Sequence, residues 1–111
     1  MIKNNKPTII DEIRYILKKR NVRHSLHALK EEMREGLTAQ EVEDALLKGF
    51  ELVEDYPNDP RGHSCLILIR IKDKPVHVVC APHEEALIIV TVYVPSIEDW
   101  KQNFRTRRKG K

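Results

Sequence analysis

Residues 25–49 read SLHALKEEMREGLTAQEVEDALLKG, and this stretch decides the fold because it contains the signals of two consecutive helices. In its first half, Leu26, Leu29 and Met33 recur at helical spacing. This spacing predicts a helix over residues 25–35 that carries the three side chains on its buried face. The N-terminal part of the chain is therefore expected to be helical.

Capping residues mark the ends of the predicted helices. Gly36 stands where a left-handed residue terminates a helix. Residues 38–41 read TAQE, which has the form of a capping box and predicts another helix that ends at Gly49. Upstream, isoleucines at helical spacing predict a first amphipathic helix over residues 8–20. Three helices are thus expected before residue 50.

After these helices the apolar period changes from helical to alternating, which is typical of strands. Four strands are predicted, over residues 50–56, 64–71, 76–81 and 87–94. A loop rich in turn-forming residues joins the first two, and Asp73-Lys74 predicts a tight hairpin between the second and third. Short links of this kind favour an antiparallel meander.

The C-terminal part is predicted to hold a short amphipathic helix over residues 97–104, which includes Trp100, and then a basic tail over residues 105–111. The order of elements predicts an α+β domain in which N-terminal helices pack on a four-stranded antiparallel sheet, with a short C-terminal helix. The length of 111 residues fits a single domain. Within it we expect an N-terminal extension over 1–23 and an α+β core over 24–104.

Composition places the chain among ordinary soluble proteins, with 41% hydrophobic and 33% charged residues. The longest apolar run, over residues 86–94, is far shorter than the roughly 20 residues that a membrane-spanning helix needs. Cys65 and Cys80 lack a C-x-x-C spacing and are interpreted as small apolar core residues in a reducing compartment. The polar residues 1–6 predict no secretory signal, so we expect a cytoplasmic protein without membrane contact.

Charge is distributed unevenly along the chain. The net charge is +5 over residues 1–23, −6 over 24–56, −2 over 57–99 and +6 over 100–111. Clustered Lys and Arg at the two ends permit nucleic-acid contact, because phosphate binding depends on local clusters of positive charge. The same pattern permits solvated tails or pairing between subunits.

On the helix predicted over residues 25–35, His27, Lys30 and Arg34 form one stripe beside the expected buried face. Cations and a titratable imidazole side by side suit a phosphodiester substrate, because they neutralise negative charge and move a proton near neutral pH. Polar residues that flank an apolar face are also an ordinary property of amphipathic helices. Both interpretations remain open at this point.

His77 and Tyr93 lie inside predicted strands, where apolar residues are the default. Either they form the sheet side of a cleft whose helix side is His27 and Arg34, or they are hydrogen-bonded in place as structural residues. A metal site is not expected, because His77 and Cys80 are three residues apart on a strand and point to opposite faces. No cofactor is expected either.

Several short segments together resemble a known family. They are residues 27–28, 33–38, Val42 and Ala45 before Gly49, 76–79, 89–95, and Trp100. This set is similar to the small prokaryotic family called domain of unknown function 4258, over about residues 24–108. That family in turn resembles RelE-type and BrnT-type toxins in its order of elements, and these toxins are ribonucleases of toxin–antitoxin operons.

The resemblance implies a function as well as a fold. It implies a metal-independent RelE-like endoribonuclease. Its implied catalytic residues are His27, Arg34, His77 and Tyr93, and the residues expected to bind nucleic acid are Lys30, Arg105, Arg107 and Arg108. The expected partners are RNA and either a cognate antitoxin or a second copy of the chain. The alternatives are a non-enzymatic protein-interaction module that uses the sheet face or the first helix, and nucleic-acid binding without cleavage.

Overall fold

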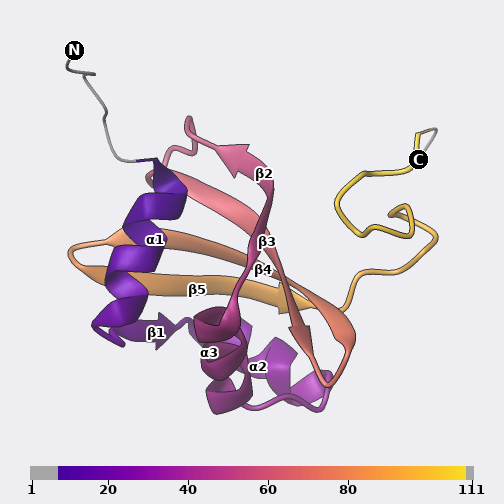
Figure 1. Cartoon of the computed structure of the whole chain (residues 1–111), viewed down its shortest axis with the longest axis horizontal. Helices are drawn as coiled ribbons and strands as arrows, with labels where there is room; N and C mark the ends of the chain where they lie inside the picture. The colour runs from indigo at the N-terminus through magenta and orange to yellow at the C-terminus, as the bar shows by residue number, and fades with distance from the viewer. Residues whose placement is uncertain (1–7, 110–111) are drawn as a thin grey trace.

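The computed structural model describes residues 8–109 and shows three helices beside a five-stranded sheet (Figure 1). The elements are α1 (Ile9–Lys18), β1 (Val22–His24), α2 (Leu26–Arg34), α3 (Ala39–Lys48), β2 (Glu51–Tyr56), β3 (Ser64–Ile71), β4 (Lys74–His83) and β5 (Ala86–Tyr93). The α+β class predicted from the sequence is confirmed. Among these residues, no helix combines the length and the apolar character needed to cross a membrane.

The sheet is mixed, with the strand order β1-β5-β4-β3-β2. Strands β2 to β5 form the predicted antiparallel meander, but β1 adds a fifth strand that runs parallel to β5. The prediction of a purely antiparallel four-stranded sheet was therefore wrong. Because β1 has only 3 residues, Val22–His24, it is too short to show an alternating pattern, and only its pairing with β5 reveals it.

The helix signals in the sequence operate as predicted. The capping boxes at Thr8 and Thr38 are both formed and begin α1 and α3. At the end of α2, Gly36 has a φ of +75°, and the Leu37 amide donates to the Glu32 carbonyl at 2.8 Å. This is the Schellman arrangement that a C-terminal glycine favours. It turns the chain sharply from α2 into α3.

One face of the sheet packs against the helices and forms the core. In Figure 1, α1 lies across β4 and β5, which it contacts, and α3 contacts β3. The apolar face of α1 is fully used in this core, with Ile9, Ile13, Ile16 and Leu17 buried. Tyr15 is the one large apolar side chain that this helix leaves exposed.

The rotation of α2 differs from the prediction. Leu26, Leu29 and Met33, which the sequence placed on the buried face, are 68%, 41% and 78% exposed. Ala28 and Glu32 are buried in their place, and Glu32 is only 2% exposed. The helix thus turns its apolar stripe toward solvent and a carboxylate toward the interior.

Polar bonds to β5 explain this rotation, because β5 extends beyond its pairing with β1 and leaves a free edge. The Ser25 hydroxyl donates to the Val90 carbonyl at 3.0 Å, and the Val92 amide donates to the Glu31 side chain at 2.8 Å. These side chains satisfy backbone groups that an open sheet edge exposes. They hold the Ser25 and Glu31 side of α2 against β5, so the leucines face outward.

The predicted C-terminal helix over residues 97–104 is not formed. The segment instead makes turns closed by an isolated antiparallel bridge between Trp100 and Arg107. Within the turn, the Asn103 side-chain oxygen accepts from the amides of Arg105 and Thr106 at 2.9 and 3.1 Å. An Asn side chain that bonds neighbouring amides competes with helix formation. The buried Trp100 then anchors the segment to the sheet.

Candidate active site

His77 occupies the middle of β4 and is completely buried. Its Nε2 lies 2.6 Å from the Phe104 backbone carbonyl, and its Nδ1 lies 2.9 Å from the Tyr93 hydroxyl. A carbonyl only accepts hydrogen bonds, so Nε2 carries the proton. In the neutral ring, Nδ1 therefore accepts the proton of the Tyr93 hydroxyl.

The surroundings of His77 favour this neutral form. The Trp100 ring meets the imidazole edge-on, with the ring centroids 4.5 Å apart. Burial lowers the pKa of His77 below its ordinary value, and the hydrogen bond to the Phe104 carbonyl opposes this shift only in part. Nδ1 of His77 is thus a hydrogen-bond acceptor for the phenol hydroxyl of Tyr93.

This arrangement predicts how His77 titrates. We expect its ring to be mostly neutral at pH 6.5, the ordinary value for histidine, with the proton on Nε2. Long-range proton–nitrogen NMR of the imidazole distinguishes the two tautomers and follows the titration. A midpoint at or above 6.5, or a neutral ring with its proton on Nδ1, would contradict the expectation.

Tyr93 is the neighbour of His77 in the β4 and β5 pairing and is partly exposed. Burial raises the pKa of its phenol, so the hydroxyl keeps its proton at neutral pH. Because His77 is enclosed and Tyr93 is not, Tyr93 is the member of the pair that a bound molecule can touch.

A second polar group lies beside this pair. Arg107 makes a two-pronged ion pair with Glu54, at 2.7 and 3.1 Å, and its guanidinium stacks 4.5 Å from the centroid of the Trp100 ring. The Arg107 bond lowers the pKa of Glu54. Burial, followed by the bond to Glu54, raises the pKa of Tyr56 to about 12. The network fastens the C-terminal segment over the sheet.

The helix residues that the sequence analysis predicted for the site lie on α2, beside the free edge of β5. The exposed His27 ring pairs with Glu31 at 3.3 Å, and the other oxygen of Glu31 accepts from the Val92 amide. His27 is thus linked through Glu31 to the backbone of Val92. The Val92 side chain belongs to the core, whereas the neighbouring Tyr93 packs against His77 on the other face of the sheet. Lys30 and Arg34 are exposed on α2 and take part in no ion pair among residues 8–109.

The three C-terminal arginines expected to bind nucleic acid all make intramolecular contacts. Arg105 lies 3.8 Å from Glu51, and Arg107 holds Glu54. The Arg108 side chain donates to the carbonyls of Ile97 and Trp100. Their charge is therefore partly neutralised by contacts with the same chain.

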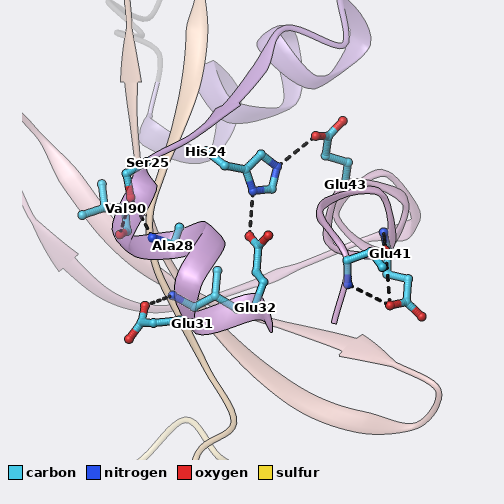
Figure 2. Close-up of polar contacts among 10 residues, drawn as sticks. His24, Ser25, Ala28, Glu31, Glu32, Glu41, Glu43 and Val90 are labelled. Atoms are coloured by element: carbon cyan, nitrogen blue, oxygen red, sulfur yellow. Dashed lines mark hydrogen bonds and ion pairs between the residues drawn. The ribbon is translucent and has the colours of Figure 1, made fainter. Parts of the chain in front are cut away.

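Sequence reasoning missed a largely buried polar cluster formed by His24, Glu32 and Glu43 (Figure 2). The His24 ring lies between two carboxylates, with Nδ1 2.6 Å from Glu32 and Nε2 2.9 Å from Glu43. The cluster joins the end of β1 to α2 and α3. The sequence pattern placed Leu26, Leu29 and Met33 on the buried side of α2. The cluster could be recognised only once the structure showed that Glu32 is buried instead.

The cysteines are buried and lie opposite each other in the pairing of β3 with β4. Their burial fits the prediction that they are apolar core residues. Cys80 belongs to the core on the helix side, whereas His77 packs against Trp100. Within residues 8–109, no three His, Cys, Asp or Glu side chains are grouped so that they could hold a metal ion.

Comparison with known proteins gives one match. The model of the family described as a domain of unknown function (DUF4258) matches residues 24–94. No curated protein and no solved structure matches the chain. The matched region contains His27, His77 and Tyr93 and leaves out α1 and the C-terminal segment that covers His77. Since the match spans more than half of the sequence, the chain belongs to the DUF4258 family.

Proposed function

We propose that this domain is a metal-independent endoribonuclease whose reacting hydroxyl is that of Tyr93. The observation that carries the proposal is the 2.9 Å contact between this hydroxyl and Nδ1 of His77. A partly exposed phenol next to a buried neutral imidazole is a short relay for a proton, and proton transfer from the attacking hydroxyl is a step that side chains catalyse without a metal.

The proposed reaction uses the ribose as its own nucleophile. The 2′-hydroxyl gives its proton to the Tyr93 oxygen while the Tyr93 proton moves to Nδ1 of His77. The 2′-oxygen then attacks the adjacent phosphorus, and the bond from phosphorus to the 5′-oxygen breaks. His27 acts as the general acid and gives a different proton to the leaving oxygen, and the products are a 2′,3′-cyclic phosphate and a 5′-hydroxyl.

Cationic side chains on α2 complete the proposed site. Lys30 and Arg34 lie on the same helix as His27 and neutralise the charge that develops on the phosphate. Arg105, Arg107 and Arg108 contact RNA only after they exchange their present carboxylate and carbonyl partners. The activity would match that of RelE-type and BrnT-type toxins, so a cytoplasmic location and an antitoxin partner belong to the same proposal.

The test is cleavage of a mixed-sequence RNA by the purified full chain in EDTA. We expect cleavage that leaves cyclic phosphate ends and falls about 10²–10⁴-fold in His27→Ala, the usual contribution of a general acid. His83→Ala is the matched control, since His83 is exposed on β4 and outside the site. Absence of cleavage by the folded wild-type chain, or equal loss in both variants, would refute the proposal.

A further inference from the structure

The outward apolar stripe of α2 is the most unusual surface of the described chain. A surface helix normally turns its apolar stripe toward the core. Here Leu26, Leu29 and Met33 lie on one exposed side of the helix, while Ala28 and the Glu32 carboxylate lie on its buried side. Single exposed apolar side chains are ordinary, but three on one helical face form a contiguous patch that marks an interaction surface.

The helix cannot rotate to hide this patch. Ser25 and Glu31 bond the free edge of β5, and Glu32 bonds the buried His24 (Figure 2). A turn of α2 that buried Leu26 and Met33 would break all three contacts and leave a carboxylate and backbone groups without partners. The patch is therefore a fixed feature of the folded domain.

Positive charge lies along one side of the patch. Lys30 and Arg34 are one helical turn apart, and at about 100° per residue they fall beside Leu26 and Met33. No carboxylate pairs with either of them within residues 8–109. Both cations are therefore free to meet an external anion, whether the phosphate of the proposed reaction or the carboxylates of a protein partner.

We propose that this face of α2 docks an amphipathic segment of a different protein, in which apolar anchors are flanked by carboxylates. Anchors spaced as on a helix match the i, i+3, i+7 spacing of Leu26, Leu29 and Met33. Carboxylates in the partner complement Lys30 and Arg34. An antiparallel twofold contact between two copies of α2 would place their cationic sides next to each other, which disfavours a second copy as the occupant.

The experiment is selection of a displayed library of random 16-residue peptides on the full-length chain, in the absence of RNA. Enriched peptides are synthesised, and their affinity is measured for the wild type and for three variants. Leu26→Ser with Met33→Ser removes two anchors, and Lys30→Glu reverses one charge. Ile97→Ser is the matched control, because Ile97 is 61% exposed but lies on the C-terminal segment.

The proposal expects enriched peptides that combine apolar residues at helical spacing with Asp or Glu. Their Kd should rise about tenfold or more in the Leu26 and Met33 double variant, because each buried apolar side chain contributes well over tenfold. Lys30→Glu should raise the Kd about fivefold and reduce its salt dependence, and Ile97→Ser should leave it unchanged. Because these residues are exposed, we expect all the variants to stay folded. Circular dichroism checks this.

Other results would overturn the proposal. They are the absence of enriched peptides, peptides without carboxylates, or affinities that the α2 variants do not change. Sedimentation showing a dimer of the wild type that Met33→Ser dissociates would identify a second copy as the occupant and would also overturn it. The selection contains no RNA and uses no cleavage assay, so its outcome is independent of the ribonuclease proposal.

Discussion

Replacement of His24 by alanine is expected to lower the free energy of unfolding by about 3–5 kcal/mol. The His24 ring is the only hydrogen-bond partner of the Glu32 carboxylate within the described chain, and its second oxygen has none. Without the ring, a carboxylate that is 2% exposed stays in the interior with no hydrogen-bond partner for either oxygen. Since a domain of this kind is stable by only about 5–15 kcal/mol, the loss would be a large share of the total.

Chemical denaturation followed by circular dichroism measures this difference. His27→Ala is the matched control, because His27 lies three residues away, is exposed and contacts a single carboxylate. We expect this control to stay within about 0.5 kcal/mol of the wild type. A combined His24→Leu and Glu32→Leu variant should recover much of the stability, since it removes the buried charge together with its partner. A loss below about 1 kcal/mol in His24→Ala would contradict the expectation.

Tyr93→Phe is expected to lower RNA cleavage by about 10²–10⁴-fold, the usual contribution of a positioned proton-transfer group. The substitution keeps the aromatic ring that packs on His77 and removes only the hydroxyl that the ring nitrogen faces. The fold should be kept, because leaving Nδ1 of the buried His77 without its partner costs about 1–3 kcal/mol, less than the usual stability of a domain. The effect should therefore appear in the rate and not in the amount of folded protein.

Tyr56→Phe provides the comparison for this prediction. It also removes a tyrosine hydroxyl, but that hydroxyl belongs to the network of Glu54 and Arg107. It bonds Glu54 and has no hydrogen bond to His77. Single-turnover cleavage rates of the two variants, measured in EDTA with equal folded protein, separate a role in proton transfer from a general effect on the network. If Tyr93→Phe cleaves as fast as Tyr56→Phe, Tyr93 is not the reacting group.

The helices illustrate what could be predicted from the sequence. Thr8, Thr38 and Gly36 act within a few residues of themselves, through capping bonds that any chain with these residues can form. Strands β2 to β5 were predictable for a similar reason, because their alternating pattern is long and their links are short. In the candidate site, His77 and Tyr93 were predicted to lie on the sheet, and the structure pairs them.

Three features could not be predicted in this way. The strand β1 is recognisable only through β5, and the C-terminal segment follows the anchoring of Trp100 instead of its own helical period. The burial of His77 beneath the Phe104 carbonyl depends on that segment as well. Each feature depends on a contact between residues far apart in the chain. The spacing of apolar residues within a short segment contains no information about such contacts.

The orientation of α2 shows most clearly which features local sequence determines and which depend on tertiary contacts. The amino-acid sequence by itself determined that residues 26–34 form an amphipathic helix, because spacing and capping are local properties. It did not determine which face is buried. The buried face was decided by hydrogen bonds between the side chains of Ser25 and Glu31 and the backbone of β5, across 65 and 61 residues of chain. Leaving the polar groups of the sheet edge without partners would cost more free energy than exposing this apolar stripe.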